Sequence, residues 1–128
     1  MNEKPSTLKK IFVIEDDVFI GSILTEKIKE SHMDVHLFTT AEDALIALES
    51  EIPDVILLDI YLPGMDGLTA LDQIRKNEKT KDIPVIVLSN NAEKKDRDEA
   101  ARLGARFLVK ASIDPGEVLH ILLDMFKK

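Results

Sequence analysis

Polar residues that could do chemistry stand directly after the apolar runs of this chain. They are Glu15, Asp16, Asp17, Asp59, Ser89 and Lys110. Carboxylates that lie close together repel one another unless a hard cation that prefers oxygen ligands binds among them. Mg²⁺ is the cation that this set favours, and Mn²⁺ is an alternative. Together with the metal, Lys110 and Ser89 could balance the charge of a phosphoryl group on Asp59.

The elements that must position these residues begin with apolar runs rich in β-branched residues. Four runs lack polar alternation, and they span residues 11–14, 55–58, 85–88 and 107–109. Such runs are typical of strands that are buried on both faces of a parallel sheet. A weaker, partly polar run at residues 35–38 suits an edge strand beside the first one.

Segments with the apolar spacing of helices separate the strands. Ile20, Leu24 and Ile28 form one such series, and Ala41 and Ala44 begin another. Strand and helix therefore alternate five times, which predicts an α/β fold in which helices cover both faces of a parallel sheet. In such sheets, sites gather at the carboxyl ends of the strands, where all the candidate residues stand.

Local signals predict where several helices begin and end. Three pairs predict N-terminal caps, namely Thr40 with Asp43, Asn90 with Glu93, and Asp114 with Glu117. Pro115 suits the first position of the last helix. Gly104 predicts a left-handed residue at the end of the fourth helix.

The composition leaves room for one domain. The chain has 128 residues, of which 45% are hydrophobic and 32% are charged, and it has no cysteine. We expect a disordered lead-in over residues 1–8 and one domain over residues 9–128. No tract is long enough to cross a bilayer, so we expect no membrane partner. Because the chain has no cysteine and no apolar h-region follows the start Met, we expect a cytoplasmic protein. The net charge of -7 argues against direct binding to nucleic acid.

Each candidate residue also has a simpler structural interpretation. Asp16 or Asp17 could cap the first helix, and Asp59 could begin an Asx turn. Ser89 could merely end a strand, and a lone Lys110 is usually solvated. One shared site explains four strand ends more simply than four separate roles.

The sequence resembles the receiver domains of two-component signalling, a family that includes the chemotaxis response regulators. The resemblance extends from about Lys10 to Phe126. Four motif segments carry it, at residues 11–17, 55–67, 87–89 and 104–110. The fold it implies is a flavodoxin-like three-layer sandwich, with five helices around a five-stranded parallel sheet in the order 2-1-3-4-5.

The resemblance also implies roles for individual residues. Asp59 would be the phosphoacceptor. Glu15 and Asp16 would be the acidic pair, with Asp16 as the direct metal ligand and Asp17 as a peripheral third acid. The backbone carbonyl of Tyr61 would be the remaining protein ligand. The implied protein is a signalling phosphoacceptor and not an enzyme, and a histidine kinase or a phosphotransfer protein would be its partner.

The resemblance further implies a conformational switch. Ser89 would bind a phosphoryl oxygen, Lys110 would pair with the phosphoryl group, and Phe107 would stand at the aromatic switch position. The fourth helix, predicted over residues 92–103, is charged throughout residues 93–99, so little apolar burial anchors it. Its core residues would be Ala92, Ala100 and Leu103. We expect a downstream partner on the face made by the fourth helix, fifth strand and fifth helix.

Two residues depart from the family pattern. Asn90 stands where a small residue is usual, and it could narrow access to Asp59. Ala111 stands where the family usually has a proline joined by a cis bond. Because a cis bond before a non-proline residue costs about 2.5 to 4 kcal/mol, we predict a trans bond between Lys110 and Ala111.

Two alternative functions remain open. A pseudo-receiver would bind partners without being phosphorylated, and Asn90 keeps this hypothesis open. A phosphatase of the haloacid-dehalogenase type would also use an aspartate after an apolar strand, with Mg²⁺. In that family a second Asp follows two residues later, whereas Tyr61 stands at that position here.

Overall fold

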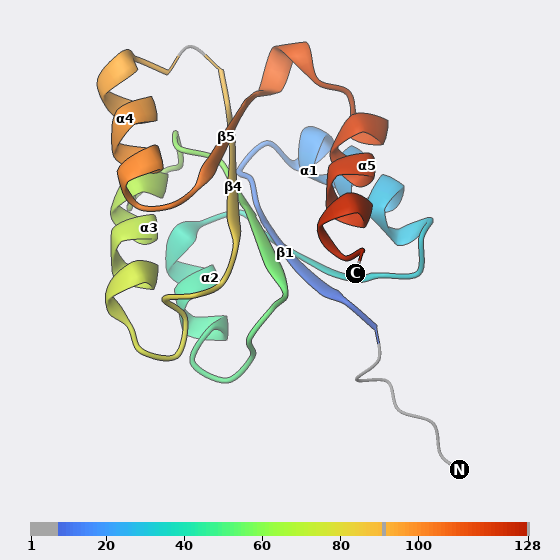
Figure 1. Cartoon of the computed structure of the whole chain (residues 1–128), viewed down its shortest axis with the longest axis horizontal. Coiled ribbons are helices and arrows are strands. Elements are labelled where there is room, and N and C mark those ends of the chain that lie inside the picture. Colours follow the sequence, from blue (N-terminus) through green and yellow to red (C-terminus); the bar gives the residue numbers. More distant parts are fainter. Residues whose placement is uncertain (1–7, 91, 128) are drawn as a thin grey trace.

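Strands and helices alternate along the whole of the computed structural model, which describes residues 8–90 and 92–127 (Figure 1). The elements are β1 Lys10–Ile14, α1 Val18–Lys29, β2 Asp34–Phe38, α2 Ala41–Ala47, β3 Val55–Leu58, α3 Gly67–Lys76, β4 Val85–Ser89, α4 Lys94–Arg102, β5 Arg106–Val109 and α5 Pro115–Met125. A single 3-10 turn, Lys110–Ser112, lies between β5 and α5. Apart from Leu8, the predicted lead-in lies outside the described residues.

The five strands are parallel and form one sheet in the order β2-β1-β3-β4-β5. Helices α1 and α5 cover one face of the sheet, and α2, α3 and α4 cover the other (Figure 1). The predicted three-layer sandwich and strand order are therefore confirmed. No helix in the described part of the chain is long and apolar enough to span a membrane.

Alternate residues of the central strands pack into two separate cores. Phe12 and Ile14 of β1 belong to the core beneath α2, α3 and α4, whereas Ile11 and Val13 belong to the core beneath α1 and α5. All four side chains are at most 1% exposed. Burial on both faces explains why the runs of β1, β3 and β4 show no polar alternation. The same prediction is wrong for the run at residues 107–109, because β5 lies at the edge of the sheet and Val109 is 46% exposed.

The strands agree with the sequence prediction to within one residue at each end. β4 extends one residue further than predicted, to Ser89, which pairs with Val109 of β5. β1 begins one residue earlier, at Lys10, which pairs with Asp34. Polar residues therefore join the ladder where a neighbouring strand offers backbone partners, although the apolar pattern has already ended there.

The helix caps are confirmed at three of the four predicted positions. Thr40 accepts a hydrogen bond from the backbone of Asp43. Asp114 and Glu117 form a reciprocal capping box at the start of α5. Gly104 has a φ of +75°, as expected for a left-handed residue after α4.

The predicted cap of α4 at Asn90 is wrong. The helix begins at Lys94, and Glu93 occupies the capping position without a side-chain hydrogen bond. The side-chain oxygen of Asn90 instead accepts a hydrogen bond of 2.7 Å from the backbone N–H of Ala111. The side-chain oxygen of Asn90, which the local pattern assigned to the start of α4, therefore binds a residue that is distant in the sequence. Within α4 only Ala100 is buried, which agrees with the predicted weak anchoring.

Candidate functional site

The polar residues that follow β1, β3, β4 and β5 lie at one end of the sheet. Ile14 pairs with Leu58 in the ladder between β1 and β3, and the backbone N–H of Asp59 donates to the carbonyl of Ile14. Glu15 and Asp59 therefore leave two neighbouring strands at the same level. This parallel register explains why residues 44 positions apart in the sequence occupy one site.

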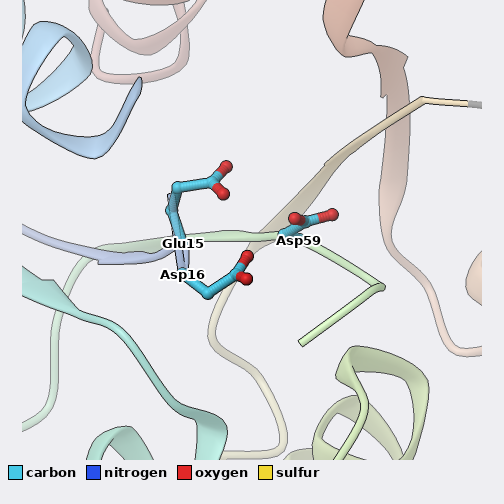
Figure 2. A group of neighbouring side chains, drawn as sticks. All are labelled: Glu15, Asp16 and Asp59. Atoms are coloured by element: carbon cyan, nitrogen blue, oxygen red, sulfur yellow. The ribbon is translucent and has the colours of Figure 1, made fainter. Parts of the chain in front are cut away.

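Three carboxylates come together at this edge. Each of Glu15, Asp16 and Asp59 has a carboxylate oxygen within 4.8 Å of one from each of the other two. Figure 2 shows the three side chains grouped at the ends of β1 and β3. Glu15 and Asp59 are buried, whereas Asp16 is exposed. A set of carboxylate oxygens that is buried on one side and open to water on the other fits Mg²⁺, which keeps part of its water shell when bound.

Lys110 supplies a positive charge to this group. Its ammonium lies 2.6 Å from a carboxylate oxygen of Glu15 and 3.2 Å from Oδ2 of Asp59. Burial lowers the pKa of Lys110, but hydrogen bonds and charge from the two carboxylates outweigh it, so the net pKa lies above the usual value. Lys110 is therefore a cation throughout the physiological range.

Glu15 is a crowded carboxylate. Burial raises its pKa, and the neighbouring charge of Asp59 adds to the rise, while hydrogen bonds from Lys110 and from the backbone of Asp17 lower it. The net pKa lies above the ordinary value of 4.5. The ammonium that Glu15 shares with Asp59 does not fully compensate for the burial of Glu15, which favours an additional cation at this place.

Stability should therefore depend on pH through Glu15. Because its pKa is higher in the folded protein than in the unfolded chain, the folded state binds this proton more tightly. The contribution of Glu15 to the free energy of unfolding is thus largest below pH 4.5 and falls as the pH rises through its raised pKa. We expect Glu15→Gln to remove this fall in the metal-free protein.

Chemical unfolding of both proteins at several pH values between about 4 and 8 would check this expectation. Glu30→Gln is the matched control, because Glu30 is an exposed carboxylate that pairs with Lys27 on the surface of α1. If the free energy of unfolding of the wild type and of Glu15→Gln changed with pH in the same way, the expectation for Glu15 would be contradicted.

Two donors converge on Oδ1 of Asp59. The hydroxyl of Ser89 donates to it over 3.1 Å, and the backbone N–H of Tyr61 donates over 3.3 Å. Ser89 is 1% exposed, so its hydroxyl is held in place by the protein around it. Oδ1 thus has neutral donors, while Oδ2 faces Lys110.

Tyr61 connects the site with α4. Its half-exposed ring places the hydroxyl 3.3 Å from Oδ2 of Asp96, to which it donates a hydrogen bond. Partial burial and the carboxylate of Asp96 raise the pKa of this phenol, which therefore keeps its proton. The role expected for Tyr61 at the site involved its backbone carbonyl. Nothing in the sequence indicated that its side chain reaches a residue 35 positions away.

Asp17 and Phe107 lie outside the cluster of carboxylates. Asp17 caps α1, because its Oδ1 accepts a hydrogen bond from the backbone of Ile20. This confirms the simpler interpretation for Asp17. Phe107 pairs with Val87 in the sheet and packs, partly buried, on the core beneath α2, α3 and α4.

Helix α3 begins directly against the backbone of the phosphoacceptor candidate. The N–H of Gly67 donates to the carbonyl of Ile60 over 2.7 Å. A Cβ atom at Gly67 would lie 2.1 Å from the carbonyl oxygen of Asp59. Only glycine fits this close approach, so Gly67 allows α3 to support the loop that follows β3.

The two residues that depart from the family pattern are in contact. Asn90 follows Ser89, Ala111 follows Lys110, and the hydrogen bond described above joins them. The Lys110–Ala111 bond is trans, as predicted, like every other peptide bond in residues 8–90 and 92–127. From the sequence, the two departures were expected to act independently. Both Asn90 and Ala111 directly follow a site residue, and this was the one indication in the sequence that the two are connected.

A doubly wound parallel sheet with carboxylates, a hydroxyl and a lysine at its carboxyl edge places the chain among the α/β domains that carry their sites at this edge. A family model described as the response regulator receiver domain matches residues 11–123. The chain belongs to this family. Its membership argues against the phosphatase of the haloacid-dehalogenase type.

Similar proteins include both regulators and isolated receiver domains. The chain is 33% identical over 110 residues to the alkaline phosphatase synthesis transcriptional regulatory protein PhoP of Bacillus subtilis, covering 86% of this chain and 45% of PhoP. It therefore spans less than half the length of that relative.

Two solved structures share the fold over nearly the whole chain. One is the phosphorylated cyanobacterial phytochrome response regulator RcpA, with 27% identity and a TM-score of 0.79 over 92% of this chain and 91% of that one. The other is the receiver domain of the sensor histidine kinase PA1611 from Pseudomonas aeruginosa, with magnesium in its active site cleft. It has 27% identity and a TM-score of 0.81, covering 91% of this chain and 96% of that one.

Proposed function

We propose that this chain accepts a phosphoryl group on Asp59 from a histidine kinase, a phosphotransfer protein or a small phosphodonor, with a divalent metal bound beside it. The observation that carries the proposal is the environment of Asp59. Its carboxylate is buried, lies within 4.8 Å of the carboxylates of Glu15 and Asp16, and contacts both Lys110 and Ser89. The phosphorylated state of RcpA and the magnesium in the PA1611 receiver domain support it by similarity.

The residues of the chain would share the work of transfer. A carboxylate oxygen of Asp59 forms a bond to phosphorus while the bond from phosphorus to the donor breaks, and the electron pair of that bond leaves with the donor. Lys110 pairs with the phosphoryl oxygens. The hydroxyl of Ser89, which donates to Asp59 in the unmodified protein, turns to a phosphoryl oxygen.

Asp16, Asp59 and the backbone carbonyl of Tyr61 would hold Mg²⁺, or Mn²⁺ in its place, with Glu15 beside them. A bound divalent ion would supply positive charge where carboxylates and phosphoryl oxygens meet. Lys110 alone carries one positive charge among three carboxylates, which is why a metal should be required.

The direct test is mass spectrometry of the wild-type protein incubated with acetyl phosphate. We expect the mass of one phosphoryl group to be added when Mg²⁺ is present and none when a chelator replaces it. Mn²⁺ should restore the modification. The pseudo-receiver hypothesis instead predicts an unmodified mass under every condition.

We further propose that phosphorylation changes the face made by α4, β5 and α5, where a downstream partner would bind. The two ends of α4 are held differently. At its C-terminal end the guanidinium of Arg75 donates to the carbonyl of Leu103 over 2.6 Å. At its N-terminal end Glu93 provides no side-chain cap. The hydrogen bond between Tyr61 and Asp96 is exposed and long, so it adds little.

Amide hydrogen exchange with and without beryllofluoride, which imitates a phosphoryl group, tests this second proposal. Because the N-terminal end of α4 is the weaker one, exchange should change more over residues 92–98 than over residues 99–103. The exchange rate of the Phe107 amide should also change, because we expect its ring to move together with Ser89. Asp59→Asn with the same reagent is the control. Changes confined to the loops that touch Asp59 would reject the switch and favour a static docking module.

A further inference from the structure

Asn90 and Ala111 join the two loops that carry Ser89 and Lys110. The Oδ1 atom of Asn90 accepts a hydrogen bond of 2.7 Å from the backbone N–H of Ala111. Asn90 directly follows Ser89 at the end of β4, and Ala111 directly follows Lys110. The bond therefore connects the immediate neighbours of two residues that contact the carboxylate of Asp59.

This contact needs both departures from the family pattern. A proline at position 111 would have no N–H to donate, and a glycine or alanine at position 90 would have no side-chain oxygen to accept it. Because residue 111 is alanine, it keeps the backbone N–H that donates to Asn90. Asn90 and Ala111 thus form a matched pair, in which each residue supplies what the other requires.

The bond is also the tighter restraint on the turn that begins with Lys110. The closing bond within this turn, from Ile113 to the carbonyl of Lys110, is 3.5 Å long and therefore weak. The hydrogen bond from Ala111 to Asn90 is 0.8 Å shorter (3.5 against 2.7 Å). Lys110 must direct a long, flexible side chain at Glu15 and Asp59, so the backbone next to it has to be held in place.

We propose that Asn90 is a positioning residue, which holds Lys110 against Asp59 through the backbone N–H of Ala111. This role rests on the proposed function, because it concerns the transfer of a phosphoryl group to Asp59. Asn90 does not touch the phosphoryl group itself. It takes over, through a side chain, the fixing of the turn that a proline would otherwise provide.

The first experiment is Asn90→Ala, with the initial rate of phosphoryl incorporation and the amide exchange of Ala111 as readouts. We expect the rate to fall about 5-fold and the exchange of the Ala111 amide to accelerate by at least as much, which is the size expected from one neutral hydrogen bond. Mg²⁺ affinity should stay unchanged, because none of the three carboxylates is altered. Loss of the fold would change all three readouts.

Two further variants at single positions serve as controls. Asn77→Ala removes an equivalent bond far from the site, since Oδ1 of Asn77 accepts from the backbone of Lys79 over 2.8 Å. It should leave the rate unchanged. Asn90→Asp keeps a side-chain oxygen with the same reach and should preserve the protection of the Ala111 amide.

A double-mutant cycle tests whether Asn90 acts through Lys110. In a Lys110→Met background, followed over longer times, Asn90→Ala should cause no further loss of rate, because the group that Asn90 positions is absent. If the losses multiply instead, or if Asn90→Ala alone increases the rate or leaves it unchanged, the positioning role is overturned. An increase would make Asn90 an obstacle to access.

The experiment separates this role from the function on which it rests. A wild-type protein that takes up no phosphoryl group would overturn both. Normal labelling of the wild type, combined with an Asn90→Ala rate equal to that of Asn77→Ala, would overturn the role of Asn90 alone. Unprotected exchange of the Ala111 amide in the wild type would also overturn it.

Discussion

Asp59→Asn should reduce phosphoryl incorporation to background. The carboxylate that forms the bond to phosphorus becomes a neutral amide, which is a far weaker nucleophile and a weaker metal ligand. The fold should persist, because the amide oxygen can still accept from Ser89 and from the backbone of Tyr61. The variant also loses one of three crowded carboxylates, so the pKa of Glu15 should fall.

Intact-mass measurements after incubation with acetyl phosphate and Mg²⁺ would check this result. Asp72→Asn is the matched control, because Asp72 lies on the surface of α3 and pairs with Lys76. Its labelling should equal that of the wild type. If Asp59→Asn were labelled as fully as the control, another residue would be the acceptor.

Lys110→Met should lower both the stability and the rate of phosphorylation. Its ammonium contacts the buried carboxylates of Glu15 and Asp59, which would lose this partner. Removing one member of a fully buried ion pair costs about 3 to 5 kcal/mol. Because the side chain of Lys110 is 16% exposed, we expect a smaller loss of about 2 kcal/mol. Labelling should fall about 100-fold, since a charged group that contacts the transferred phosphoryl is removed.

Mg²⁺ gives this prediction a second readout. With the ammonium gone, the three carboxylates should depend more strongly on a bound cation, so Mg²⁺ should raise the melting temperature of Lys110→Met more than that of the wild type. Lys94→Met is the control, because the side chain of Lys94 is 81% exposed and pairs with Asp98 on its own helix. Equal stability and an equal response to Mg²⁺ in all three proteins would contradict the assignment.

Most of the fold was predictable because the central strands are buried on both faces. An unbroken apolar run such as residues 55–58 indicates such a strand without any knowledge of its neighbours. The start of α4 was not predictable in this way. The pattern from Asn90 to Glu93 is a sound local signal, but Asn90 bonds to Ala111, which lies 21 residues later in the chain.

The location of the site was predictable for a related reason. In a parallel sheet, the residues after the strands meet at one edge, so Glu15, Asp59, Ser89 and Lys110 could be grouped from the sequence. Which atoms pair with which was not predictable. That Lys110 lies closer to Glu15 than to Asp59 depends on distances that no pattern encodes. The sequence pattern alone also left open which of Asp16 and Asp17 caps the helix, and only the family resemblance separated the two residues.

Tyr61 has a practical consequence for experiments on this protein. It is the single tyrosine of a chain without tryptophan, so the intrinsic fluorescence arises almost entirely from one phenol ring. That ring stands between the backbone beside Asp59 and the carboxylate of Asp96 on α4. A carboxylate that accepts a hydrogen bond from an excited phenol quenches its emission. The native protein therefore carries its own optical probe, and a brighter emission would report the separation of Tyr61 from α4 without any added label.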